Sequence, residues 1–360
     1  MAQKTSPCCC TPPYVTGTVT TAGGAVRLVD TRLSPADRRG RLWCRLSNAF
    51  RMRYRVAPGL YGTGAPTAES PVFVSANYKM SFDALRAALA GLDAWILVLD
   101  TNGINVWCAA GKGTFGTDEL VRRIEQTDLG SVVSHRRLVL PQLGAPGVKA
   151  HEVKTRSGFR VVYGPVDARD IPGFVAGSYR AAPDTRRVRF SLLHRLALTP
   201  MELVPALRHY LLFALGALAF FGLEPDGILF REAWARGRLF LGLGLGAVLA
   251  GTVALPLLLP WIPPRSFAVK GWLLGVAVVG LVHRFWPHPL LSDPFTLAAA
   301  YIAFPAAASY LALNFTGCTT FTGKSGVKRE LQPALWAYIG CASASVILLV
   351  LHKLTHWGIP

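Results

Sequence analysis

The chain has 360 residues, of which 51% are hydrophobic and only 16% are charged, and its formal net charge is +18. The charged share is below that of an ordinary soluble domain, and the deficit lies after Pro205, where long apolar runs are nearly free of charge. A basic balance suits nucleic acid or an anionic membrane surface. Because the densest arginine cluster (186–195) directly precedes the first apolar run, we expect a lipid bilayer as partner and no nucleic acid.

Residues 1–31 lack the apolar core of a secretory signal, so we expect the soluble part of the chain to stay in the cytoplasm. Residues 1–44 are predicted to be a disordered N-terminal segment. The seven cysteines do not indicate a disulfide framework, since their number is odd and two lie within or beside apolar runs. Cys8, Cys9 and Cys10 lack the spacing of zinc or iron–sulfur ligands. We interpret them as part of a solvated tail, with scavenging of soft metal ions as the alternative.

Five apolar segments are each long enough to cross a bilayer, which takes about 20 residues. They cover residues 205–223, 239–259, 267–285, 294–315 and 333–351. We therefore predict an all-α transmembrane domain of about five helices over residues 205–360, preceded by a basic linker, 186–204. Loops rich in Lys and Arg face the cytoplasm. This rule predicts a multi-pass protein of the cell (inner) membrane with a cytoplasmic N-terminal domain.

Residues 45–185 alternate strand-like and helix-like segments, which is typical of an α/β sheet with crossover helices. The predicted strands are 72–76, 95–100, 132–134 with 138–140, and 159–163, and the predicted helices are 81–91 and 118–126. The run 95–99 is continuously apolar, as in a strand that is covered on both faces. Ligands bind such sheets at the carboxyl ends of the strands, which places the site after Asp100.

The segment after Asp100 reads TNGINVWCAAGKGTFG over residues 101–116. Its three glycines match the dinucleotide motif GxGxxG, but ten residues separate them from the strand and the expected acidic residue downstream is missing. A Walker phosphate loop is excluded, because Val106 and Gly113 stand where a Gly and a Ser or Thr are required. The remaining interpretation is a short helix, 105–110, that presents small residues and a thiol to a flat ligand.

The segment NVWCAAGKGTFGT resembles the cap-helix motif of the corrinoid protein of microbial mercury methylation, a membrane-bound protein that works with a small ferredoxin. Four other stretches agree with that family: SANYKMSFDALR (75–86), SHRRLVLPQLGAPGV (134–148), GFRVVYGPVDARDIPGF (158–174) and NFTGCTTFTGKSGVKRE (314–330). The resemblance runs from about residue 46 to the end. It implies a Rossmann-like α/β corrinoid-binding domain over residues 45–185. The Trp107–Cys108 pair distinguishes this family from the related corrinoid iron–sulfur protein of acetyl-CoA synthesis.

The resemblance implies that Cys108 is the catalytic residue and the lower axial ligand of cobalt in a cobalamin or related corrinoid. The cofactor is expected base-off, because the DxHxxG motif of histidine-ligated cobalamin proteins is absent. A thiolate is a soft, strongly electron-donating ligand. The identity of the axial ligand strongly influences the reactivity of such a cofactor. Further cofactor contacts are expected from Ser75, Asn105, Val106, Trp107, Ala109, Ala110, Gly111, Lys112, Gly113, Thr114, His135, Gln142 and Ala168. The family usually has Thr at the position of Ser75, and Ser at that of Cys318.

The activity implied by the resemblance is transfer of a cobalt-bound methyl group to inorganic Hg(II), giving methylmercury. The implied partners are a ferredoxin-like protein with two 4Fe-4S clusters and a methylated-folate-linked methyl donor. The chain has no CxxC spacing, so the iron–sulfur reductant must be a separate protein. Two alternatives stay open. A corrinoid methyl carrier of an acetyl-CoA-type pathway is disfavoured by the apolar segments, and a membrane sensor or transporter is disfavoured by the cap-helix cysteine.

Overall fold

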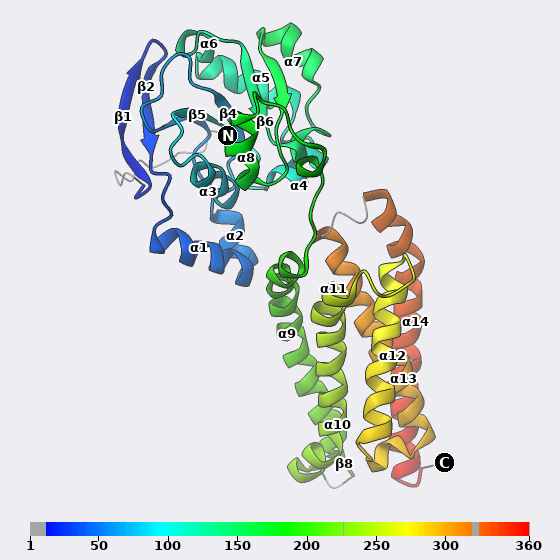
Figure 1. Cartoon of the computed structure of the whole chain (residues 1–360). Helices are drawn as coiled ribbons and strands as arrows, with labels where there is room; N and C mark the ends of the chain where they lie inside the picture. Colours follow the sequence, from blue (N-terminus) through cyan, green and yellow to red (C-terminus); the bar gives the residue numbers. More distant parts are fainter. Residues whose placement is uncertain (1–11, 226, 319–323, 360) are drawn as a thin grey trace, which may run out of the picture. The chain divides into compact units, whose positions relative to one another are not determined.

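A computed structural model describes residues 12–225, 227–318 and 324–359 (Figure 1). The chain divides into two compact units, Met1–Arg189 and Phe190–Pro360. The first is an α/β unit and the second is helical, which confirms the predicted fold class. Cys8, Cys9 and Cys10 lie outside the described residues, as does the side chain of Cys318.

A seven-stranded mixed sheet forms the centre of the first unit, with strand order β1-β2-β3-β5-β4-β6-β7 (Figure 1). The strands are β1 (Val15–Thr21), β2 (Gly24–Val29), β3 (Gly59–Thr63), β4 (Val72–Ala76), β5 (Ala94–Leu99), β6 (Arg137–Leu140) and β7 (Arg160–Tyr163). Strands β5, β4, β6 and β7 are parallel, whereas β3 runs antiparallel to β5 and the β1–β2 hairpin extends that edge. The carboxyl ends of four strands therefore meet at one edge of the sheet.

The helices of the first unit connect the parallel strands in a doubly wound order. They are α1 (Pro35–Leu46), α2 (Asn48–Arg53), α3 (Lys79–Ala88), α4 (Val106–Lys112), α5 (Thr117–Gln126), α6 (Leu129–Val132), α7 (Ala150–Ser157) and α8 (Ile171–Ala176), with single turns η1 (Gln142–Gly144), η2 (Ala168–Asp170) and η3 (Pro183–Arg186). From β4 the chain passes through α3 to β5 on one side, and later through α4–α6 to β6 on the other. The reversal makes the carboxyl end of β4 and β6 the place where such folds bind ligands.

Strand β5 is covered on both faces, as its apolar run predicted. Trp95, Leu97 and Leu99 join a hydrophobic cluster with α5 and α7, and Ile96 and Val98 join a second cluster with α3 and α8. All six residues of the strand are buried. Alternate side chains of one strand thus hold the two helical layers of the unit together.

The structure differs from the sequence prediction in two segments of the first unit. Residues 15–46, expected to be largely disordered, form β1, β2 and α1. The valines and threonines of β1 favour a strand, and α1 begins at a capping box in which Ser34 and Asp37 bond each other's backbone N–H. The predicted strand 132–134 is wrong, because α6 extends to Val132 and β6 begins only at Arg137.

Four buried charges tie α1 to α3. Lys79 Nζ lies 2.7 Å from Asp37 Oδ1 and 2.6 Å from Asp83 Oδ1, and Arg86 contacts the same two carboxylates at 2.8 Å. Burial alone would raise the pKa of Asp37, but hydrogen bonds from Lys79 and Ser34 hold it below the ordinary range. Each buried charge has an opposite partner, so we interpret the cluster as the anchor of α1 on the sheet unit.

Among its described residues, the second unit contains five helices that are long and apolar enough to cross a membrane. They are α9 (Leu192–Gly222), α10 (Phe230–Leu249) with its π-helical continuation (Ala250–Ala254) into α11 (Leu255–Leu258), α12 (Phe267–Phe285), α13 (Pro294–Asn314) and α14 (Lys324–His356), with a short hairpin of β8 (Leu223–Glu224) and β9 (Gly227–Ile228). Most of the predicted linker 186–204 is therefore helical, because α9 starts at Leu192. Helices α12 and α13 approach closely at Gly275, where a Cβ atom would lie 2.5 Å from Pro305 Cα.

Candidate functional site

Helix α4 lies at the carboxyl edge of the sheet, after β5, and its first turn is held by Asn105. The side-chain oxygen of Asn105 accepts a hydrogen bond from the backbone N–H of Cys108 at 2.9 Å. At the other end Gly113 adopts a left-handed conformation with φ 84°, which glycine takes without strain. The Thr114 hydroxyl lies 3.5 Å from the Ala109 carbonyl oxygen. The helix carrying Cys108 is thus defined at both ends.

The loop from β5 into α4 is fixed by Asn77, a buried residue that directly follows β4. Its side-chain oxygen accepts the backbone N–H groups of Thr101 at 3.1 Å and Gly103 at 2.9 Å, and its amide donates to Asp100 Oδ1 at 3.0 Å. The Thr101 hydroxyl lies 2.6 Å from the carbonyl oxygen of Ile104. Asn77 was not among the residues predicted from the sequence. The sequence feature that could have identified it is a polar residue directly after a predicted buried strand, inside the stretch SANYKM.

The two sides of α4 have different surroundings. Val106, Ala109 and Ala110 are buried in the core of the unit. The two alanine side chains pack inward on the sheet, so a contact between a ligand and Ala109 or Ala110 stays a prediction that concerns their backbone. The outward side carries Trp107, which is 40% exposed, together with Asn105, Gly111 and Lys112, which are exposed, and the half-buried Cys108. Since residues three apart share a helix face, Cys108 lies between Asn105 and a glycine.

The segment after β6 packs directly onto the end of α4. A Cβ atom at Gly147 would overlap the Phe115 carbonyl oxygen and lie 2.9 Å from Ala110 Cα, so a glycine is required there. Beside this contact, η1 packs against α4. The side-chain oxygen of Gln142 is buried there, and it has no hydrogen-bond partner within the described part of the chain. A buried acceptor without a donor is costly unless a ligand or water supplies one.

The remaining predicted residues lie at two opposite edges of the sheet. Ser75 is buried near the carboxyl end of β4, and Ala168 begins η2 after β7, so both are at the same edge as α4. His135 precedes β6 and its Nε2 lies 2.9 Å from the carbonyl oxygen of Ser70, which precedes β4. His135 is therefore at the amino edge and does not join the others. The erroneous strand 132–134 had placed it at a carboxyl end.

Glu119 on α5 holds the end of β5 from the other side. It accepts the Asp100 backbone N–H at 2.7 Å, pairs with Arg123 at 2.7 Å and also contacts Arg122. Burial alone would raise the pKa of Glu119, but these hydrogen bonds lower it below its ordinary value. Glu119 therefore stays ionised at neutral pH and accepts the Asp100 N–H group where the loop from β5 to α4 begins.

Cys108 has no neighbouring set of protein ligands in the described ranges 12–225, 227–318 and 324–359. No group of three or more His, Cys, Asp or Glu residues there could hold a metal ion. A single soft thiol is a ligand for a transition metal, and a metal macrocycle brings its other ligands with it.

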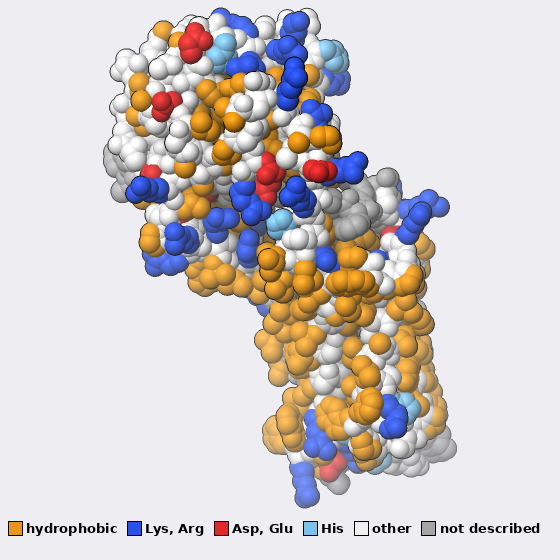
Figure 2. Space-filling model, viewed as in Figure 1, with side chains coloured by type: hydrophobic (Ala, Val, Ile, Leu, Met, Phe, Trp, Pro, Cys, Tyr) orange, Lys and Arg blue, Asp and Glu red, His pale blue; other side chains and the backbone are white. Residues whose placement is uncertain are grey.

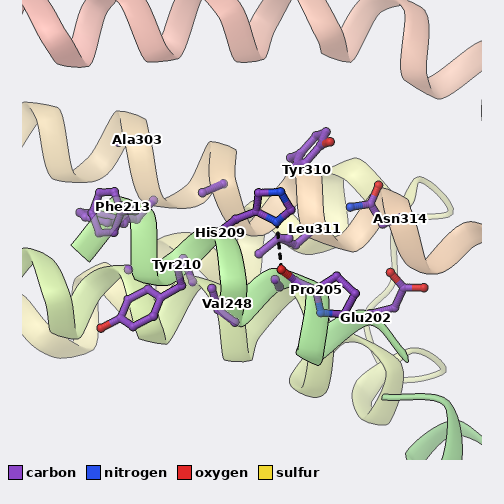
Figure 3. Close-up of a pocket in the computed structure, with 15 residues that line it drawn as sticks. Glu202, Pro205, His209, Tyr210, Phe213, Val248, Ala303, Tyr310, Leu311 and Asn314 are labelled. Carbon is purple, nitrogen blue, oxygen red and sulfur yellow. Dashed lines mark hydrogen bonds between the residues drawn. The ribbon is translucent and has the colours of Figure 1, made fainter. Parts of the chain in front are cut away.

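The second unit contains a cavity of about 490 Å³ lined by residues of α9, α10 and α13 (Figure 3). Its polar side chains are Glu202, His209, Tyr210, Tyr310 and Asn314, and His209 Nδ1 lies 2.9 Å from the Pro205 carbonyl oxygen. The other lining residues are apolar. Such a lining suits an apolar chain better than a hydrated ion.

Part of the first unit is similar to known proteins. Residues 49–175 match the family described as CO dehydrogenase/acetyl-CoA synthase delta subunit. The chain is 34% identical over 122 residues to the acetyl-CoA decarbonylase/synthase complex subunit gamma of Methanopyrus kandleri, covering 33% of this chain and 26% of that protein. It is 33% identical over 123 residues to the subunit gamma of Archaeoglobus fulgidus, covering 34% and 26%.

Residues 49–175 are distantly related to these subunits. The matched region contains β3–β7 and α4, so the relationship covers the sheet edge and the helix that carries Cys108. The chain spans about a quarter of the length of the curated relatives it matches. The β1–β2 hairpin, α1 and the whole second unit lie outside the matched family region.

We predict that Gly147→Ala displaces α4, because the added Cβ overlaps backbone atoms that cannot rotate away. Overpacking of this kind costs about 1–3 kcal/mol. Hydrogen exchange of the full chain in detergent should therefore accelerate in residues 106–116. Gly173→Ala is the matched control, since nothing lies within 4 Å of a Cβ at that position. Unchanged exchange in the Gly147 variant would contradict the close packing of the two segments.

Proposed function

We propose that this chain is a membrane-anchored corrinoid methyltransferase that passes a methyl group to inorganic Hg(II). The observation that carries the proposal is the outward position of Cys108 on a capped helix at the ligand-binding edge of the sheet. The relationship to acetyl-CoA decarbonylase/synthase subunits supports a corrinoid as the ligand. The resemblance of the Trp107–Cys108 motif to the mercury-methylation family supports Hg(II) as the acceptor.

The residues at this edge fit a corrinoid. The Cys108 thiol is partly exposed, and Gly111 on the same helix face leaves room for a planar ring. The buried oxygen of Gln142 needs a donor, which the amide side chains of a corrinoid provide. When bound, the cofactor would supply a cobalt-bound methyl group. In the proposed site Cys108 would be a ligand of the metal, and Ser75, Gln142 and Ala168 would contact the cofactor.

The protein's own contribution is to orient a strong donor. Asn105 holds the backbone of Cys108, and the Asn77 network fixes the loop before it. A thiolate at this position would donate electron density to the metal, which would favour transfer of the methyl group to a soft electrophile such as Hg(II). Lys112 at the end of α4 is exposed and suits an anionic group of the cofactor.

Two partners and a location complete the proposal. The methyl group comes from a methylated-folate-linked donor, and electrons come from a ferredoxin-like protein with two 4Fe-4S clusters. The absence of CxxC spacing in the sequence supports a separate reductant. The five long apolar helices support a multi-pass anchor in the inner membrane. The distribution of Lys and Arg supports a first unit that lies on the cytoplasmic side of that membrane.

The competing function is a methyl carrier of an acetyl-CoA-type pathway, which the matched relatives favour. One feature counts against it, because the second half of the chain consists of helices long enough to cross a membrane. A sensor or transporter is the third candidate, and the cavity of the second unit, whose lining is mainly apolar, does not favour transport of a hydrated ion.

We expect Cys108→Ala to change the visible spectrum of the cobalt-loaded protein and to lower methylmercury formation by at least about 100-fold, since even outer-shell changes at metal sites cost about 10–100-fold. Cys341→Ala is the control, because Cys341 is the other partly exposed free cysteine among the described residues. The measurement is single-turnover methylation of Hg(II) under strict anoxia. Full activity of Cys108→Ala would overturn the role of the thiol.

Topology gives a second test. In sealed right-side-out vesicles, added trypsin should leave the first unit intact and cut near Arg231, which follows the β8–β9 hairpin. In inside-out vesicles the same protease should remove the first unit. Immunoblotting with antibodies against each unit reads both outcomes. Loss of the first unit in right-side-out vesicles would reverse the proposed orientation.

A third test concerns the reductant. Multiple-turnover methylation should require a low-potential ferredoxin or an artificial donor of similar potential, because the chain contains no iron–sulfur ligand spacing. A single turnover from pre-methylated protein should proceed without either. Sustained turnover with a methyl donor alone would contradict the partner requirement, while leaving the assignment of Cys108 intact.

A further inference from the structure

The outward side of α1 and α2 combines basic and apolar side chains on one surface, here called the α1–α2 face. Its arginines are the exposed Arg38, Arg39 and Arg53 and the half-buried Arg41, Arg45 and Arg51, with the exposed Arg55 just after α2, and its large apolar residues are Leu42, Trp43, Phe50 and Met52. Leu42 is 56% exposed and Trp43 is 55% exposed. Figure 2 shows basic and hydrophobic atoms together where Figure 1 places these two helices.

The positive charge of the α1–α2 face has no acidic counterpart in the neighbouring sequence. No Asp or Glu occurs anywhere in residues 38–68. The nearest carboxylate in sequence, Asp37, points the other way and is buried in its pairs with Lys79 and Arg86. The face is therefore strongly cationic, with a Trp among the arginines.

The inner side of α1 holds the face in place. Asp37, Gly40 and Cys44 are buried, and a Cβ at Gly40 would overlap the phenol ring of Tyr54. Tyr54 in turn is tied to the sheet unit, since its carbonyl oxygen accepts the Lys79 backbone N–H at 3.0 Å. The exposed side chains therefore lie on two helices that are packed against the rest of the unit.

We propose that the α1–α2 face binds the anionic lipid surface of the membrane in which the chain is anchored. Arginine around Trp and Leu is the composition of helices that lie in the membrane interface, where Trp residues gather at the level of the headgroups. Each Arg near an anionic surface strengthens binding roughly fivefold. Because the same chain carries helices long enough to span the bilayer, the surface is present at high effective concentration.

Docking of this face bears on the candidate site through the loop before α4. A Cβ at Gly103 would lie 3.4 Å from the Met52 carbonyl oxygen and 3.5 Å from Arg55 Cδ. The α1–α2 face therefore adjoins the loop that Asn77 organises. Lipid binding would hold the carboxyl edge of the sheet beside the membrane surface, whatever ligand that edge takes.

The test uses the full chain in nanodiscs of phosphatidylcholine alone and of phosphatidylcholine with about 30% phosphatidylglycerol, read by hydrogen exchange. Residues 36–54 should exchange more slowly in the anionic discs, and 0.5 M salt should remove the difference. The triple variant R38Q/R39Q/R53Q should lose most of this protection. The triple variant K154Q/R160Q/R180Q removes the same charge from exposed positions elsewhere on the unit and should keep it. W43S, at a half-exposed position, should weaken it.

Equal exchange of residues 36–54 in the two kinds of disc would overturn the proposal. So would equal loss of protection in both triple variants, because the effect would then follow net charge and not this face. Protection that appears only after addition of an acidic two-cluster ferredoxin would assign the face to a protein partner instead. None of these readouts depends on the cofactor, so the proposed methyltransferase function stands or falls separately.

Discussion

Loops at the carboxyl edge of a parallel sheet contain backbone N–H groups that have no acceptor on a neighbouring strand. In this chain the side chain of Asn77 supplies an acceptor for two of these groups. One side-chain oxygen accepts two N–H groups of the loop between β5 and α4, while the amide reaches Asp100. The loop can then pass through the left-handed conformations of Asn102 and Gly103, with φ 56° and 73°. Everything proposed for Cys108 depends on this arrangement, because it decides where α4 starts and which side of it faces outward.

The second fixed element is the glycine contact between α4 and the segment after β6. Gly147 lets two backbones approach to a distance that any side chain would prevent, and it does so next to the unpartnered oxygen of Gln142. The carboxyl edge of the sheet is thus held rigidly by the backbone contact at Gly147. The neighbouring Gln142 oxygen still needs a hydrogen-bond donor. This combination is typical of a preformed ligand site.

The sequence predicted the elements whose signals are local. Strand β4 was placed at residues 72–76 without error and the helix carrying Cys108 within two residues, because a continuous apolar run and an Asn N-cap are visible without tertiary context. Strand β3, GLYGT, has no such signal and forms because β5 offers it a partner. The inward packing of Ala109 and Ala110 also could not be read, since either side of a short helix of small residues can face a sheet. His135 was misplaced because residues 132–134, which are the last residue of α6 and the start of the loop after it, were predicted to be a strand.

The part of the chain that matches the known family and the parts that do not match it differ in composition. The region related to acetyl-CoA decarbonylase/synthase subunits, residues 49–175, holds the parallel strands and the candidate site. Helix α1, with most of the arginines of the α1–α2 face, precedes it, and the five long apolar helices follow it. Both additions have the composition that a bilayer binds, one at its charged surface and one in its apolar interior. If the proposed corrinoid site meets its substrate or its electron donor at the membrane, these two additions would keep the related region, residues 49–175, at that surface.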